Sequence, residues 1–185
     1  MVSRKAFASA IRRLLDAGFH FTVIGGTVVE VALKSKDLGP DVDVFAEDPN
    51  VFFEEEYYRV AEELGWGVGQ TWLGTPSLIA RVEGEEFPVE FYDNLFDFNV
   101  PEEILRRAVR VNIEGVRVKM VTLEDHIVLK ANAGRSQDMD RLKELARLAR
   151  KGKLRVDEAR LREAASLFPD EKVILRRLRE AGFTV

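Results

Sequence analysis

The sequence predicts an α+β fold in which a small mixed β-sheet with flanking helices is followed by a C-terminal helical bundle. Two observations predict it. Short apolar runs bounded by glycine and other turn residues, which are typical of strands, alternate with helical patterns over residues 1–121. From Thr122 onward nearly every segment has helical spacing. We therefore expect an α/β core over residues 1–121 and a helical region over 122–185 that belongs to the same compact unit.

Each element has a local reason. The first helix and the helix over 51–64 carry apolar residues at helical spacing and end at Gly18 and Gly65. Turn residues at 84–86 and 114–115 separate pairs of apolar runs, which predicts two hairpins. The expected elements, in order, are helix 3–17, strand 21–24, helix 25–36, strand 41–45, helix 51–64, strands 77–82 and 87–92, helix 101–110, hairpin 111–120, and helices 122–133, 136–151, 156–168 and 170–181.

The composition excludes several classes of protein. The chain has no cysteine and only two histidines, so disulfides, a thiol nucleophile, a zinc–thiolate site and a His-rich metal site are not expected. No apolar run approaches the roughly 20 residues that span a bilayer, and the N-terminus lacks the apolar region of a secretory signal. We therefore expect a cytoplasmic protein without membrane association. The 19 arginines against 9 lysines and the lack of cysteine are typical of a thermophile.

Charge is distributed unevenly along the chain. Residues 1–100 hold 8 Lys and Arg against 18 Asp and Glu, whereas residues 101–185 hold 20 against 14. The acidic half is suited to a cation and the basic half to phosphate, although solvated helix faces would give the same pattern.

Asp41 and Asp43 are the first candidate site residues. On a strand, residues two apart point to one face, so these carboxylates project together while Val42 and Val44 enter the core. Paired carboxylates repel one another unless a cation lies between them, and Mg2+ is bound by one or two carboxylates together with water and phosphate oxygens. Two solvated side chains on an edge strand remain the alternative.

Gly25 and Gly26 lie between a strand and a helix. Free backbone N–H groups at a helix start attract anions, and glycine lets a phosphate approach the backbone closely. Thr27 adds a hydroxyl there. With the two aspartates, this pattern predicts a nucleotide phosphate chelated with Mg2+. A third carboxylate is expected on a neighbouring strand, and Glu90 is the candidate because it alternates with apolar Val89 and Phe91.

Three segments resemble a known family. The segment GGTVVEVALKSKDLGPDVDVF is similar to the glycine-pair and D-x-D signature of nucleotidyltransferases in the DNA polymerase β-like superfamily, and FPVEFY is similar to their third-carboxylate strand. The segment VTLEDHIVLKANAGRSQDMDRLKEL resembles the toxin-type subgroup found in abortive infection and type IV toxin–antitoxin pairs. The departures are Glu90 in place of aspartate, Gln137 in place of a lysine, and Arg141 in place of a later aspartate.

The resemblance implies a role for each candidate. Gly25, Gly26 and Thr27 would bind the triphosphate, and Lys130 and Arg135 would contact its phosphates. The remaining candidates are acids that would bind Mg2+ and act in catalysis: Asp41, Asp43 and Glu90.

Two histidines and two tryptophans are further candidates. For His126, which lies four residues before Lys130, and for His20, structural or solvent-facing positions are favoured. Trp66 and Trp72 flank a glycine-rich stretch, and packing in the core or at the rim of a site is favoured over stacking on a base.

The function expected is transfer of a nucleoside monophosphate from an NTP to an acceptor, with Mg2+ as cofactor. The resemblance implies RNA or a protein as acceptor and an antitoxin protein as partner. Two alternatives stay open: a catalytically silent nucleotide-binding module, and a small-molecule nucleotidyltransferase of the antibiotic-modifying kind.

Overall fold

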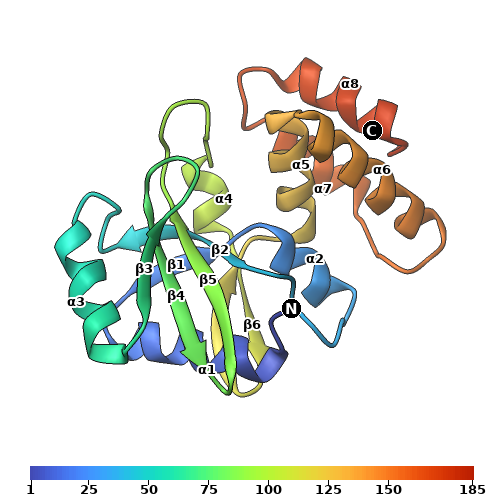
Figure 1. Cartoon of the computed structure of the whole chain (residues 1–185). Coiled ribbons are helices and arrows are strands. Elements are labelled where there is room, and N and C mark those ends of the chain that lie inside the picture. Colours follow the sequence, from blue (N-terminus) through green and yellow to red (C-terminus); the bar gives the residue numbers. More distant parts are fainter.

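A computed structural model describes all residues, 1–185, and has the α+β fold expected from the sequence (Figure 1). One seven-stranded mixed sheet is flanked by helices, and the C-terminal helices gather at one end of it. The elements are α1 (Arg4–Asp16), β1 (His20–Val23), α2 (Gly26–Ala32), β2 (Val42–Asp48), α3 (Glu54–Leu64), β3 (Gly67–Gln70), β4 (Pro76–Val82), β5 (Glu85–Tyr92), α4 (Glu102–Arg106), β6 (Val109–Ile113), β7 (Val116–Met120), α5 (Leu123–Ala133), α6 (Ser136–Arg150), α7 (Glu158–Ala165) and α8 (Glu171–Ala181).

The strand order of the sheet is β3-β4-β5-β2-β1-β7-β6. The pairs β2–β5 and β1–β7 are parallel, and the other neighbours are antiparallel. Strand β2 therefore lies in the middle of the sheet, between two neighbours that are distant from each other in sequence. Its alternation of buried and half-buried residues gives the sheet one apolar face and one face with polar groups near the start of the strand.

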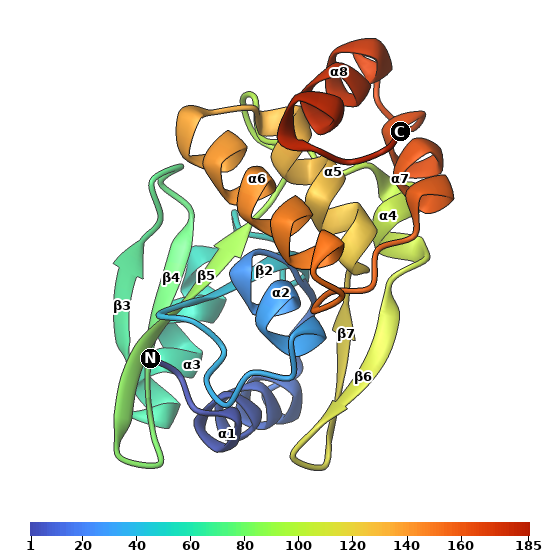
Figure 2. The same cartoon turned by 90° about the vertical axis from the view of Figure 1, so that its right-hand side faces the viewer.

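Helices α1 and α3 cover the apolar face of the sheet. Four aromatic rings meet there at edge-to-face angles, with centroids 4.9–6.3 Å apart. They are Phe19, Phe21, Tyr57 and Phe91. The opposite side carries α2, which contacts both β2 and α5, and the C-terminal helices stack above it (Figure 2).

Helix α5 is the centre of the C-terminal group and contacts α6, α7 and α8. Thr122 caps its first turn: the Thr122 hydroxyl oxygen accepts a hydrogen bond from the Asp125 backbone N–H, and the hydroxyl donates to the Asp125 carboxylate. Asp125 is fully buried and pairs with Arg107, which follows α4. This ion pair fixes α5 against the segment that enters β6.

The structure corrects several expected boundaries. Strand β3 was not expected, because two of its four residues are glycines; a Cβ at Gly67 would lie 3.2 Å from the Ile79 side chain across the strands. The hairpin between β4 and β5 turns at Glu83 and Gly84, both at positive φ, rather than over 84–86. Helix α2 ends at Ala32, four residues early, and Lys34 follows at φ +56°. No helix of the chain has the length and apolar character needed to cross a membrane.

Candidate active site

The β2–β5 ladder sets two of the predicted acids side by side. Asp43 pairs in register with Glu90, and the flanking pairs Val42–Val89 and Val44–Phe91 are buried. Since paired residues of adjacent strands point to the same face about 4.8 Å apart, both carboxylates rise from the polar face. Asp41 lies just before β2 rather than within it, close enough to Asp43 to shift its pKa.

Gly25 lies directly beneath Asp43. It is the N-cap of α2, with φ +73° and ψ −159°, a conformation open essentially only to glycine. A Cβ added to Gly25 would overlap the Asp43 carboxylate and lie 2.7 Å from the Asp43 Cβ. Gly26 differs, because its Cβ would meet nothing within 4 Å. The first glycine is therefore required by the close approach of Asp43, and the second leaves the start of α2 open.

The surroundings of Asp43 disfavour its anionic form. Burial, followed by the charges of Asp41 and Glu90, raises the pKa of Asp43 to about 7, and the positive charge of Lys130 offsets only part of this. No three Asp, Glu or His side chains converge closely enough to form a complete metal cage. The cluster is nevertheless an uncompensated negative site, and Asp41, Asp43 and Glu90 are the groups beside Gly25 that could hold a hard cation.

Tyr92 orients Glu90. Its hydroxyl donates a hydrogen bond of 2.5 Å to Glu90 Oε2, and burial together with this bond raises the Tyr92 pKa far above its ordinary value. Tyr92 is 6% exposed, and its ring lies 5.3 Å from that of Phe98, centroid to centroid. Glu90 is therefore held from one side by a neutral phenol.

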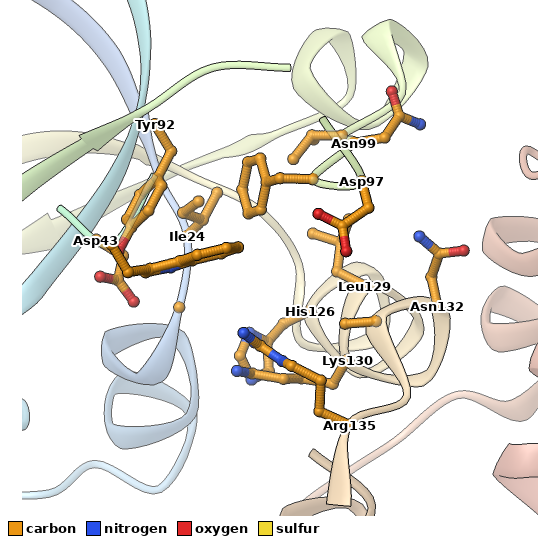
Figure 3. Close-up of a pocket in the computed structure, with 15 residues that line it drawn as sticks. Ile24, Asp43, Tyr92, Asp97, Asn99, His126, Leu129, Lys130, Asn132 and Arg135 are labelled. Atoms are coloured by element: carbon orange, nitrogen blue, oxygen red, sulfur yellow. The ribbon is translucent and has the colours of Figure 1, made fainter. Parts of the chain in front are cut away.

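A cleft of about 680 Å3, counted with the solvent at its mouth, opens between the polar face of the sheet and α5 (Figure 3). Gly25, Asp43 and Tyr92 line the sheet side, and the facing wall comes from α5 and from the start of α6. Two loops complete it: the loop between β3 and β4 contributes Trp72, and the loop between β5 and α4 contributes residues 97–100. The polar groups of the lining are Asp43, Asp97, Asn99, His126, Lys130, Asn132 and Arg135.

Lys130 and Arg135 face Asp43 across this cleft (Figure 3), and one buried carboxylate holds both cations. Asp138, 1% exposed, accepts hydrogen bonds from Lys130 Nζ at 3.1 Å and from Arg135 Nε at 2.7 Å. Burial alone would raise the pKa of Asp138, but the bonds from the two cations outweigh it and hold that pKa below its ordinary value. The wall is therefore a fixed pair of positive charges suited to an anion.

Of the two tryptophans and His126, only Trp72 is exposed. Trp66 is 6% exposed and packs in the core, whereas Trp72 is 62% exposed at the rim of the cleft, with the Arg135 guanidinium 5.6 Å from the centroid of its ring. His126 is 2% exposed, and burial with the charge of Lys130 lowers its pKa to about 3, so it is neutral at physiological pH.

One candidate hydroxyl points elsewhere. Thr27 is 1% exposed and donates its hydrogen bond to the Leu38 carbonyl at 3.2 Å, so its side chain fastens α2 to the following loop rather than reaching the cleft. Sequence reasoning missed Tyr92, Asp97, Asn99 and Asn132, which the fold brings to the cleft. The alternation that identified Glu90 also places Tyr92 on the same face, and that signal could have found it.

A search of curated protein sequences found no match. Among solved structures, the chain is similar to the solution structure of the antibiotic-resistance factor ANT(2'')-Ia, at 14% identity and TM-score 0.52, covering 95% of this chain and 91% of that one. It is also similar to a crystal structure of ANT(2'')-Ia with adenylyl-2''-tobramycin (16% identity, TM-score 0.47, 94% and 97% covered). A third is an antigenic nucleotidyltransferase-like protein from Paracoccidioides brasiliensis (14%, 0.48, 97% and 77%).

At such low identity, the match with TM-score 0.52 shows a shared fold. The family evidence covers almost the whole chain. The family described as nucleotidyl transferase of unknown function (DUF2204) matches residues 3–180, which include every element that lines the cleft. The chain belongs to this nucleotidyltransferase family.

Proposed function

We propose that the protein is a Mg2+-dependent nucleotidyltransferase that transfers a nucleoside monophosphate from an NTP to an acceptor on RNA or protein. One observation carries the proposal: Asp43 and a basic pair, Lys130 and Arg135, face each other across a single cleft. Asp41 and Glu90 lie outside the lining of the cleft, close enough for their charges to act on Asp43. A metal–triphosphate complex, which carries both signs of charge, matches that division.

The donor set fits Mg2+. Burial and the charges of Asp41 and Glu90 disfavour the anionic form of Asp43, and a bound divalent cation would stabilise that form. Mg2+ is usually bound by one or two carboxylates and completes its shell with water and substrate phosphates, so a full cage of protein ligands is not required. Asp41 and Asp43 would hold it, with Glu90 beside them. When bound, the ion supplies neutralisation of the negative charge on the phosphates.

The chain's own residues have separable tasks. Lys130 binds phosphate oxygens as a point charge and Arg135 binds them through the N–H groups of its guanidinium, and the open backbone at Gly26 admits a phosphate close to α2. Glu90, oriented by Tyr92, accepts the proton of the acceptor hydroxyl. The acceptor oxygen forms a bond to the α-phosphorus, the bond from that phosphorus to the bridging oxygen breaks, and pyrophosphate leaves.

The acceptor is the open part of the proposal. The motif over residues 121–145 favours RNA or protein and an antitoxin partner, as in the toxin-type subgroup that it resembles. ANT(2'')-Ia is described as an antibiotic-resistance factor, which keeps a small-molecule acceptor as the second candidate. A silent nucleotide-binding module is the third, and the lysine replaced by Gln137 supports it.

Calorimetric titration of each NTP with Mg2+ tests the proposal. Wild type is expected to bind only with Mg2+, and Asp41→Ala/Asp43→Ala is expected to lose that binding. The matched control is Glu55→Ala/Glu62→Ala, which removes two exposed carboxylates from α3, away from the cleft. No Mg2+-dependent binding by well-folded wild type would refute the site.

Labelled-NTP assays on RNA, protein and aminoglycosides then identify the acceptor. Mg2+–NTP binding without transfer to any of the three would select the silent module.

A further inference from the structure

We propose that Asp97 and Asn132 read the edge of the nucleobase and select bases with an exocyclic amino group over uracil. This inference rests on the proposed nucleotide site. It concerns the side of the cleft away from Asp43, where Asp97, from the loop after β5, and Asn132, from α5, both line the wall (Figure 3).

The cleft-facing side of α5 orders its chemistry from one edge to the other. At 100° per residue, Lys130 lies at one edge of this side and the neutral His126 ring lies next to it. Ala133 and Leu129 lie in the middle, and Asn132 lies at the far edge. A cation, an apolar strip and an amide therefore follow one another across one helix width of roughly 10 Å. A nucleotide has the same order, with phosphates at one end, a flat ring, and hydrogen-bonding groups at the ring's outer edge.

Aromatic side chains complete the apolar strip. Trp72 and Phe98 line the cleft from the two loops opposite α5, so a flat ring could lie among aromatic and aliphatic groups. Trp72 is 62% exposed and is held by the Arg135 guanidinium, while Phe98 is held by Tyr92. These contacts keep the two rings at the cleft without filling it.

The polar groups at the far end are unused by the fold. Three of the five asparagines bond through their side-chain amides within the protein: Asn50, Asn94 and Asn112. The other two, Asn99 and Asn132, form no such bond, and both line the cleft. The exposed Asp97 carboxylate forms no hydrogen bond or ion pair, although its charge acts on Arg135, so these groups remain available to a ligand.

Both proposed readers are held in place through their backbones. Arg177 Nη1 donates 2.8 Å hydrogen bonds to the carbonyls of Ala131 and Asn132. The loop that carries Asp97 is closed by the Asn94 amide, which bonds both the N–H and the carbonyl of Val100, at 2.7 and 3.1 Å. The site is therefore preorganised although its side chains are free.

The chemistry of the pair decides the preference. A carboxylate only accepts hydrogen bonds, so it favours the amino groups of adenine, cytosine or guanine, and an amide can serve the adjacent ring atom. The uracil edge has a carbonyl on each side of its single N–H, and a carboxylate facing it meets at least one oxygen lone pair. UTP is therefore expected to bind about tenfold more weakly than the best of the other three.

The experiment is calorimetric titration of ATP, CTP, GTP and UTP, each with Mg2+, against wild type, Asp97→Asn and Asn132→Ala. Asp97→Asn should reduce the difference in affinity between the preferred NTP and UTP severalfold, because the asparagine amide can donate a hydrogen bond to a uracil carbonyl. Asn132→Ala should weaken the preferred NTP about tenfold and UTP less. The matched control is Asp140→Asn on α6, whose side chain is 72% exposed, and it should leave all four affinities unchanged.

Mg2+–tripolyphosphate, which has no base, separates this inference from the proposed function. Its binding should survive in both variants; its absence in wild type would refute the nucleotide site itself. Equal affinity of wild type for all four NTPs, or variants that shift all four alike, would overturn the base-reading role alone. Variants in which the ratios of the four NTP affinities stay unchanged while transfer of the nucleoside monophosphate falls would also overturn it and would assign these residues to binding of the acceptor. Since neither side chain bonds within the protein, melting temperatures should change by less than about 2 °C.

Discussion

Replacing Gly25 by alanine tests the tightest contact in the site. The residue has φ +73° and ψ −159°, and an added Cβ would overlap the Asp43 carboxylate and lie 2.7 Å from the Asp43 Cβ. The backbone conformation alone costs about 1–3 kcal/mol for a residue other than glycine. Relief of the overlap requires Asp43 to move, at a further cost of about 1–3 kcal/mol.

The expected loss of unfolding free energy for Gly25→Ala is therefore roughly 3 kcal/mol. For a chain of this length, that corresponds to a fall in Tm of about 6–12 °C. Thermal unfolding followed by circular dichroism measures it, and calorimetry with Mg2+–ATP on the folded variant should show loss of nucleotide binding, because Asp43 is displaced.

Gly26→Ala is the matched control. Its Cβ would meet nothing within 4 Å, and it begins a helix, so Tm should stay the same or rise slightly. Combining Gly25→Ala with Asp43→Gly removes the overlap and leaves only the backbone cost, so the penalty of Gly25→Ala should fall by about half in that background. A Gly25→Ala protein that melts within 1 °C of wild type would refute the reasoning.

Three further predictions follow from burial and backbone geometry. Burial and neighbouring carboxylates raise the Asp43 pKa from 3.8 to about 7, so the folded state retains a proton that the unfolded chain releases; the unfolding free energy should therefore fall as pH rises from about 4 to 7, and denaturant titrations of Asp43→Asn should lack that component. Arg107→Ala leaves the fully buried Asp125 unpaired and should cost about 3 kcal/mol in urea unfolding, with partial recovery when Asp125→Asn is added; an unchanged midpoint would contradict this. Gly134 has φ +61° and lies against the Arg177 guanidinium, which bonds the end of α5, whereas Gly152 has φ +69° and an added Cβ there would meet nothing within 4 Å. Gly134→Ala should therefore lower Tm more than the control Gly152→Ala, and equal losses of Tm would argue against the contact with Arg177.

Local patterns predicted what depends on neighbours in sequence. Alternation placed Val42 and Val44 in the core and Asp43 on the other face, and it put Glu90 on the same kind of surface. The helix over 122–133 was predicted to within a residue, because Thr122 caps it and Gly134 ends it in the left-handed conformation. These features need only the period of a strand or the chemistry of a helix end.

Contacts between distant segments were not predictable in the same way. Trp72 reaches the cleft because its loop contacts Arg135, which is 63 positions away in sequence. The periodicity of a single strand or helix cannot predict a contact between such distant residues. Asp97 and Asn132 come together only when the loop after β5 and the end of α5 pack on opposite sides of one cleft. Strand β3 was not predicted for another reason: its glycine-rich segment shows no alternation of apolar and polar residues, and its extended conformation is fixed by pairing with β4.

The parallel pairing of β2 with β5 makes the site inseparable from the core. A slip of one residue in this ladder would turn Glu90 toward the aromatic cluster and set Asp43 against Val89 or Phe91. Such a sheet would bury a charge and expose apolar side chains, so the misregistered fold would be too unstable to form. A sequence that keeps Val42 and Val44 inside therefore also keeps positions 43 and 90 side by side on the polar face, so the packing of the core sets the geometry of the site.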